Sequence, residues 1–332
     1  MLKFDWPNTS YEEITTTIMA KIEKRQKNLK LKSNMCELVT EDGCKVYLVG
    51  TIHFSKQSIK DVQQVIQEVQ PDAVVLEVCQ HREQLLTLDE QSLINGSKTF
   101  DTCTMLHSIK QFGLMHTLWS MLFLRITVYL IEELGMAPGG EFRKAFREAR
   151  KIPFCNVYLG DRSIFITFQR AAAALSFWDL MKAFIGFIYV KSNTVSVGKV
   201  IMKELKQKHR LEEEIQTTMK KVPEFYRVFV TERDAYLTQA LKQAAKPIIL
   251  PKVLRSDTQT VIPSVVVGVV GIGHVAGIKK NWNKEFDTQE LDRLPNASLF
   301  TRVLQISFIV TKYGLKMIFY YKAAQTLIWL FW

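Results

Sequence analysis

Cysteine, glycine and proline are all scarce in this sequence. Only 5 of the 332 residues are cysteine, and no two of them form a C-x-x-C pair, which excludes a zinc ribbon. The odd count and the wide spacing do not favour a disulfide framework, so we expect reduced thiols in a cytosol-facing protein. With only 15 glycines and 9 prolines, the chain has few of the residues that are typical of long flexible linkers.

The sequence also lacks the motifs of several large protein classes. It has no P-loop, no G-x-S-x-G and no H-E-x-x-H motif, and the glycines from 268 to 273 miss the dinucleotide-binding spacing. Residues 1–17 contain no apolar stretch followed by a small-residue cleavage site, and their early acidic residues differ from a matrix-import presequence. We therefore expect an intracellular protein that is not secreted.

Positive charge is present in excess and is concentrated at the two ends of the chain. The formal net charge is +11, residues 21–32 carry six Lys or Arg, and no acidic residue follows Asp292. Such a balance favours nucleic acid or an anionic membrane as a partner. Because the sequence has no RRM, zinc-finger or basic-zipper pattern, we expect a membrane surface and no nucleic acid.

The C-terminal residues 299–332 predict an apolar, basic amphipathic helix. Apolar residues recur there every three or four positions and three lysines lie off that stripe, which is typical of a helix lying on a membrane, with Trp329 and Trp332 as anchors. The longest uncharged run has ten residues, whereas a spanning helix needs about twenty. Two alternatives stay open: a helix docked on the protein's own core, and a tail anchor with snorkelling lysines.

The middle of the chain has the pattern of an α/β domain. A β-rich run at 44–50 is followed by helical spacing from 55 to 70 and by a continuous apolar run at 73–78, which predicts a βαβ unit with a parallel strand pair. Further strands are expected at 152–160 and 264–270. The predicted divisions are a basic helical lead-in over 1–35, an α/β domain over 36–283 and the C-terminal helix over 299–332.

Two histidines follow predicted strands in the same pattern. Gly50 and Gly271 each begin a G-x-x-H motif, which ends in His53 and His274. Glycine lets the chain turn off the sheet, and an imidazole three residues later can point back over the strand ends. Imidazole is a ligand for transition metals and a general base near neutral pH. The alternative is that each histidine simply makes a structural hydrogen bond.

Acidic and basic residues are predicted near the same edge of the sheet. Glu77 ends a hydrophobic strand, so its carboxylate is expected to bind a metal or to pair with Arg82 or another base. Glu232 and Arg233 lie within a predicted helix, where a solvated face is the alternative. Asp234 lies in the same predicted helix as Glu232 and Arg233. The charged loop residues expected on this functional rim are Glu141, Arg143, Asp161 and Arg162.

Several segments together resemble one family in order and spacing. The resemblance covers roughly residues 35–283, and its motifs are VGTIHFS at 49–55, PDAVVLEVC at 71–79, GMAPGGEFR at 135–143, LGDR at 159–162, ERD at 232–234 and SVVVGVVGIGHVAGI at 264–278. The sequence is identified as a member of the TraB family. It is more similar to the animal intracellular branch than to the secreted Wnt-inactivating members or the bacterial pheromone-shutdown proteins.

This resemblance implies a fold and a chemistry. It implies an α/β fold related to erythromycin-esterase and ChaN-like domains, in which two pseudo-equivalent βα halves flanked by helices face a shared cleft. It also implies a metal-dependent, metalloprotease-like hydrolase acting on a peptide or protein, with a divalent ion such as Mn, Co or Zn. On that pattern His53, His274 and Glu77 are metal ligands, Glu77 and Glu232 are catalytic acids or bases, and Arg233 is an anion clamp.

The resemblance further implies a cellular location. The intracellular branch is associated with the mitochondrial outer membrane, which agrees with the basic, aromatic tail. A catalytically inactive scaffold or contact-site protein on the same fold and the same membrane is the alternative function.

Overall fold

The computed structural model describes the parts of the chain that build one α/β sheet and its covering helices. The described residues are 11–25, 32–53, 55–88, 92, 107–110, 117, 131, 137–174, 223–249 and 261–294. The predicted C-terminal helix over 299–332 and the first ten residues of the predicted lead-in lie outside them.

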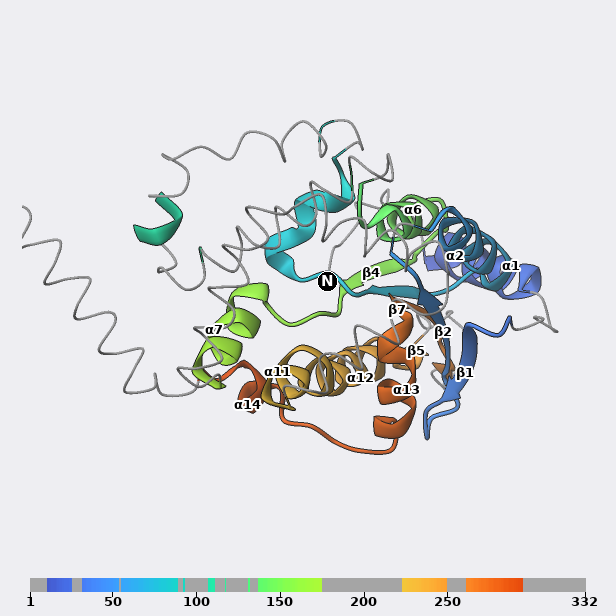
Figure 1. Ribbon diagram of the computed structural model, residues 1–332. Coiled ribbons are helices and arrows are strands. Elements are labelled where there is room, and N and C mark those ends of the chain that lie inside the picture. Colours follow the sequence, from blue (N-terminus) through green and yellow to red (C-terminus); the bar gives the residue numbers. More distant parts are fainter. Residues whose placement is uncertain are drawn as a thin grey trace, which may run out of the picture.

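Helices and strands are interspersed along the described chain (Figure 1). In order they are α1 (Tyr11–Lys24), β1 (Met35–Val39), β2 (Lys45–Thr51), α2 (Lys56–Val69), β3 (Ala73–Leu76), the 3₁₀ helix η1 (Gln80–Leu86), α6 (Gly140–Ala149), β4 (Asn156–Leu159), α7 (Ile164–Ala174), α11 (Pro223–Tyr226), the π-helical turn η2 (Arg227–Thr231), α12 (Glu232–Ala244), β5 (Ile248–Ile249), β6 (Val261–Ile262), β7 (Val265–Gly271), α13 (Ile272–Asn281) and α14 (Thr288–Asp292).

The main sheet has five strands in the order β1-β2-β7-β3-β4. β1 is antiparallel to β2, and the other neighbours are parallel. The α/β class is therefore confirmed, but the predicted pairing of the βαβ unit needs correction. β2 and β3 are parallel without being neighbours, because β7 lies between them and pairs with both.

Strand β7 occupies the centre because nearly all of it is apolar and buried on both faces. Val267 and Val269 pack into the core under α2 and α6, whereas Val266 and Val270 pack into the core under α12 and α13. This alternation follows the two-residue period of a strand. Gly268 sits between them, and a Cβ at this position would lie 2.6 Å from Leu241 Cδ2 of α12, so its lack of a side chain permits close packing.

Helix α2 confirms the predicted helix after the first strand. Ser55 caps its start by accepting a hydrogen bond from the Ser58 backbone N–H at 3.3 Å, and Gln70 ends it in the left-handed conformation at φ 48°. Val62 and Ile66 of α2 are buried against the sheet. The helix therefore carries the chain back over one face, so that β3 runs parallel to β2.

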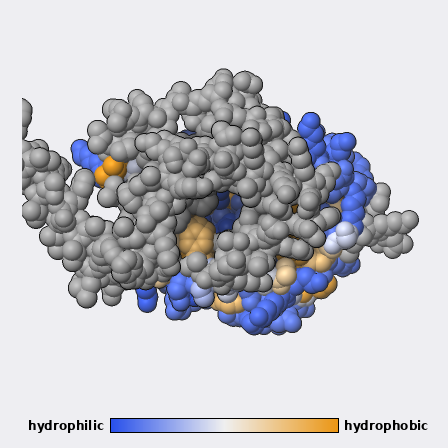
Figure 2. All heavy atoms as spheres, in the orientation of Figure 1, coloured by the Kyte–Doolittle hydropathy of each residue, from blue (hydrophilic) through white to orange (hydrophobic). Residues whose placement is uncertain are grey.

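The surface of the described residues carries only scattered large hydrophobic side chains. On the face in Figure 2, much of the described surface is hydrophilic, particularly on the right, where Figure 1 places α1 and α2. Within the described part of the chain, none of the helices combines the length and the apolar character required to cross a membrane.

Candidate active site

The parallel strands deliver four predicted polar residues to one edge of the sheet. His53 lies two residues after β2, Glu77 directly after β3, Asp161 two residues after β4, and His274 in the first turn of α13 after β7. The carboxyl ends of parallel strands meet at the same edge, which is where α/β proteins bind ligands. The four side chains therefore come from four separate strands to one place.

Gly271 marks the point around which these groups gather. A Cβ built on Gly271 would lie 3.3 Å from Glu77 Oε2, 3.7 Å from His53 Nε2 and 3.9 Å from His274 Cδ2. Two imidazoles that are more than two hundred positions apart in the chain thus surround one point, together with a buried carboxylate. We call this position the Gly271 point. A side chain at residue 271 would occupy the space between these groups.

Each imidazole is held at Nδ1 by a buried carboxylate from a helix. His53 Nδ1 lies 2.6 Å from Glu141 Oε1, at the start of α6, and His274 Nδ1 lies 2.6 Å from Asp234 Oδ1, at the start of α12. Both carboxylates are buried. A carboxylate on Nδ1 fixes the orientation of the ring and directs Nε2 to the opposite side. For His53 that nitrogen faces the Gly271 point.

Glu77 is charged and fully engaged. Its Oε2 accepts a hydrogen bond from the Gly271 backbone N–H at 2.6 Å, and its Oε1 pairs with Arg233 and lies 3.3 Å from His274 Nε2. Burial alone would raise the pKa of the Glu77 carboxyl, but the charges of His274 and Arg233 outweigh it and hold the pKa well below its usual range. Glu77 is therefore a carboxylate at neutral pH.

Arg233 is fixed between two carboxylates. Its Nε and Nη2 donate to the two oxygens of Asp161, each at 2.9 Å, and Nη2 also donates to Glu77. Asp161 in turn accepts a hydrogen bond from Arg82 Nη2 at 3.0 Å. Burial would lower the pKa of Arg233, yet Asp161 and Glu77 raise it above its ordinary value. Arg233 thus links the ends of β3 and β4 to α12.

His274 is shared between two acids. Burial disfavours its charged form, but the Glu77 charge and the hydrogen bonds with Asp234 and Glu77 raise the pKa of His274 to about 9. Burial also raises the pKa of Asp234, although the hydrogen bond with His274 acts in the opposite direction. At neutral pH the imidazole therefore carries a proton between the two acids.

The structure does not bring Glu232 to the Gly271 point. Its Oε2 accepts hydrogen bonds from Arg162 at 2.7 Å and Arg170 at 2.8 Å, and its Oε1 pairs with Arg227. Burial would raise the pKa of Glu232, but Arg170 and Arg162 lower it. Glu232 therefore belongs to a separate arginine cluster beside α14, where Arg162 Nη1 also donates to the Leu291 carbonyl at 3.2 Å.

Two of the sequence motifs interlock through these contacts. The Asp161-Arg162 pair after β4 meets the Glu232-Arg233 pair at the start of α12, and each acid binds the base of the other motif. The π-helical turn η2 precedes α12 directly, and such turns are frequent at functional sites. The interlock places Arg233 against Glu77.

The sequence predicted which residues lie at this edge of the sheet, but not which of them bind one another. The structure brings His53, Glu77, Arg233 and His274 together. Glu141 and Asp161 were expected only as charged rim residues, and Asp234 only as a charged residue of the predicted helix. Their partners lie 88, 72 and 40 positions away. The available signal was their place at a strand end or in the first turn of a helix.

Among the residues that the structure describes, no group of three or more His, Cys, Asp and Glu side chains is arranged so that it could hold a metal ion. The chemistry of the donor set nevertheless suits a divalent cation. Two histidines anchored at Nδ1 by carboxylates, together with one carboxylate, match the ligand types of many transition-metal sites. In this arrangement Glu77 is paired with Arg233, and His274 Nε2 faces Glu77. Both contacts oppose the binding of an ion.

Comparisons with known proteins agree with the motifs that surround this site. The sequence model of the TraB/PrgY/gumN family matches residues 37–285. The TraB domain-containing proteins of Mus musculus and Homo sapiens are 43% and 42% identical over 295 residues, which cover 89% of this chain and 78% of each relative. An uncharacterised protein of Methanocaldococcus jannaschii is 26% identical over 283 residues, covering 82% of this chain and 62% of that protein. The chain therefore belongs to the TraB/PrgY/gumN family.

Proposed function

We propose that this chain is a hydrolase of peptide or other acyl bonds that uses a divalent metal held by His53, His274 and Glu77. The observation that carries the proposal is the pair of carboxylate-anchored imidazoles at the Gly271 point. A purely structural histidine needs only one hydrogen bond, and it does not require a second histidine from a distant segment at the same place. A bound metal would polarise the scissile carbonyl and lower the pKa of a water molecule.

The surrounding residues have distinct tasks in this proposal. Glu141 and Asp234 hold the imidazole rings, so that Nε2 is the nitrogen offered to the ion. Of the two carboxylates considered for proton transfer, only Glu77 lies at the Gly271 point, and it would have to release Arg233 or the Gly271 N–H before one of its oxygens could accept the proton of the attacking water. Arg233 acts as a positioning residue for Glu77, because Glu77, Asp161 and the Phe229 carbonyl already engage its donors.

Metal binding at this site would require His274 to lose a proton. His274 holds a proton at neutral pH, and an imidazole nitrogen must lose its proton before it can bind a cation. Binding would therefore release a proton and become stronger as pH rises. The ion would also have to compete with Arg233 for Glu77.

Metal analysis of the purified full-length protein tests this function. We would measure metal content by mass spectrometry for the wild type, His53→Ala, His274→Ala and the double variant. The matched control is His81→Ala, because this imidazole is exposed and bonds only Ser163 Oγ, at 3.2 Å, among the hydrogen bonds of the described residues. We expect about one equivalent in the wild type and the control, and a clear loss in the double variant. An unchanged metal content in the double variant would overturn this ligand set.

One observation favours the alternative of a catalytically inactive protein on the same fold. Both oxygens of Glu77 are occupied, by Arg233 and His274 on one side and by the Gly271 backbone on the other. Such a site can have a purely structural role, in which its contacts hold β3, β7 and α12 together. A wild type without bound metal, even after incubation with Mn, Co and Zn, and without activity on peptide libraries would support this alternative.

Membrane attachment is a separate proposal that rests on the sequence. We propose that residues 299–332 attach the protein to an intracellular membrane, the mitochondrial outer membrane in the first instance, with the α/β domain facing the cytosol. The supporting features are the apolar stripe, the off-stripe lysines and the two terminal tryptophans. Deletion of 299–332 followed by cell fractionation tests it. A truncated protein that stays fully in the membrane fraction would refute the proposal.

A further inference from the structure

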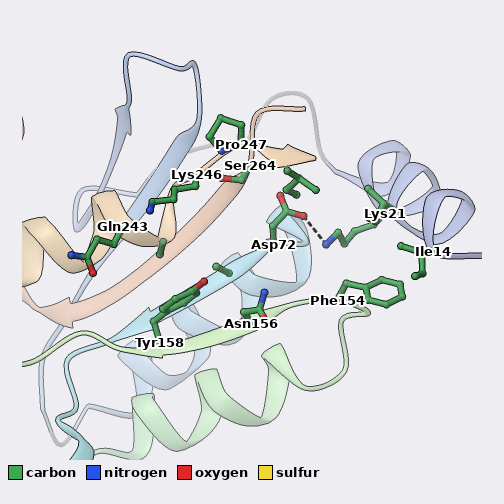
Figure 3. A pocket seen from close by; sticks show the side chains of 14 residues that line it. Ile14, Lys21, Asp72, Phe154, Asn156, Tyr158, Gln243, Lys246, Pro247 and Ser264 are labelled. Carbon is green, nitrogen blue, oxygen red and sulfur yellow. Dashed lines mark ion pairs between the residues drawn. The ribbon is translucent and has the colours of Figure 1, made fainter. Parts of the chain in front are cut away.

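A cavity lies at the edge of the sheet opposite the Gly271 point. It is open to solvent on one side, has a volume of about 350 Å³ and lies where strands β3, β4 and β7 begin, with Asp72, Asn156 and Ser264 in its wall (Figure 3). Helix α1 and the C-terminal end of α12 close its sides. This volume is within the range of small-molecule sites. The proposed hydrolase uses none of the residues that line it.

Ser264 shows that this wall is built with an unused polar group. Its side chain is buried, at 2% exposure, and Oγ has no hydrogen-bond partner. Both backbone polar groups of Ser264 have hydrogen-bond partners, since the N–H donates to Cys44 Sγ at 3.3 Å and the carbonyl accepts from the Lys45 N–H at 3.0 Å. A buried hydroxyl without a partner carries a free-energy cost, because its hydrogen bond to water is lost and not replaced. A ligand in the cavity would remove that cost.

The cavity is electrostatically suited to an anion. Asp72 is buried, but Lys21 Nζ and Arg25 Nη2 each lie 2.6 Å from one of its oxygens, so two cations more than neutralise it. Lys246 adds a third cation on the exposed side, and within the described residues it has no ion pair or hydrogen bond. Two cations of the cavity wall, Lys21 and Lys246, face one carboxylate that Arg25 also pairs with, which leaves a net positive charge beside the unused Ser264 hydroxyl.

Two more polar side chains face the same space. Figure 3 shows Tyr158 and Asn156 across the cavity from Lys246 and Ser264. The Tyr158 hydroxyl is protonated at neutral pH and can act as a donor, and burial raises its pKa further. An anion between these residues would have hydroxyl, amide and ammonium donors around it.

Apart from Gln243, the rest of the wall is apolar and comes from several segments, of which α1 is one. Ile14 and Ile18 of that helix line the cavity together with Phe154, Pro247 and Ile248. Because this apolar side lies next to the positive side, the space suits a molecule with a charged head and a short hydrocarbon body. A bare inorganic anion would leave the apolar wall unfilled.

We propose that this cavity binds a small amphipathic carboxylic acid, with the carboxylate at Lys246, Ser264 and Tyr158 and the hydrocarbon body against Ile14 and Ile18. The site lies at the opposite end of the strands from His53 and His274, so the bound acid is a second ligand and not the hydrolysed substrate. Helix α12 is common to both regions, since Arg233 and Asp234 begin it and Ala244 near its end lines the cavity.

Hexanoate is the probe for this proposal, used with the full-length protein and followed by ligand-observed NMR. Acetate lacks the hydrocarbon body and hexanamide lacks the charge. We expect saturable hexanoate binding, with hexanamide weaker by about tenfold through the loss of one charge-assisted interaction, and acetate weaker by about a hundredfold through the loss of the apolar contacts of four carbons. Equal binding of hexanoate and hexanamide would refute the carboxylate assignment, and equal binding of hexanoate and acetate would refute the apolar part.

Variants of the lining residues test whether hexanoate binds in this cavity. Lys246→Gln removes the exposed cation with little risk to folding, and Ser264→Ala removes the buried hydroxyl; each should weaken hexanoate binding by about tenfold. The matched control is Lys280→Gln, which removes the same charge from an exposed lysine on α13 and should bind like the wild type. The absence of saturable binding in the wild type, or unchanged affinity in Lys246→Gln, would overturn the proposal whatever the result for the metal site.

Discussion

Substitution of Gly277 by alanine is the sharpest test of the Asp234–His274 pair. Gly277 lies in α13, where alanine is normally the better helix former. Here, however, an added Cβ would lie 1.9 Å from Asp234 Oδ2 and 2.3 Å from its Cγ. Asp234 would have to move, and its hydrogen bond to His274 Nδ1, now 2.6 Å long, would be lost.

The size of the effect follows from three contributions. Gain of helix propensity favours Gly277→Ala by up to about 1 kcal/mol. Overpacking of a filled site disfavours it by about 1–3 kcal/mol, and loss of a hydrogen bond between charged groups by about 1.5–3 kcal/mol. The expected result is destabilisation by about 2–5 kcal/mol, the reverse of an ordinary glycine-to-alanine change in a helix.

Urea unfolding of a double-mutant cycle measures this effect. The cycle consists of the wild type, Gly277→Ala, Asp234→Ala and the double variant. Without the Asp234 carboxyl the remaining contact is to its Cβ at 3.0 Å, so Gly277→Ala should cost much less there, with a coupling above about 1 kcal/mol. Equal costs in both backgrounds, or a stabilised single variant, would show that the described packing of α13 against Asp234 is wrong.

Three further predictions concern charge and burial. Arg233→Gln should destabilise the protein by about 3–5 kcal/mol in urea unfolding, because it leaves the Glu77 and Asp161 carboxylates buried without their shared cation, and a loss below about 1 kcal/mol would contradict this account. The pKa of His274 is raised in the folded state from 6.5 to about 9, so its contribution to stability should be complete below pH 6.5 and lost as pH rises through 9; NMR titration of the ring in metal-free protein checks it, and a midpoint near 6.5 would refute the pairing. Burial raises the pKa of Cys155 to about 12, so this thiol should resist alkylation at pH 8 until the protein unfolds, as peptide mapping by mass spectrometry would show, and rapid native labelling would disprove its burial.

The local elements of the fold were predictable because their signals are local. The spacing of apolar residues in α2, the continuous valine run of β7 and the helix beginning at Pro223 all follow from neighbouring residues. The order of the strands was not predictable in the same way. A helix the length of α2 can lead to an adjacent strand or to the next strand but one, and only the pairing of β7 with both β2 and β3 decides.

The candidate site was likewise predictable in part. His53, Glu77 and His274 were predicted to converge because strand ends meet at one edge, and the structure places them there. The pairing of Glu77 was not predictable, since the nearby Arg82 binds Asp161 and the distant Arg233 binds Glu77. Helix position alone did not separate Glu232 from Asp234, and only the arginines around Glu232 showed that it faces another cluster.

The polar cluster at the Gly271 point also has a consequence for the order of folding. Its contacts join residues that are far apart in the chain, with Glu77 separated by 156 positions from Arg233 and by 194 from the Gly271 backbone. Contacts of such high sequence separation form slowly, because long loops must close first. Nascent or truncated chains that end before α13 cannot complete the cluster, because Glu77 and Asp234 would lack their contacts with His274 until synthesis has passed residue 274.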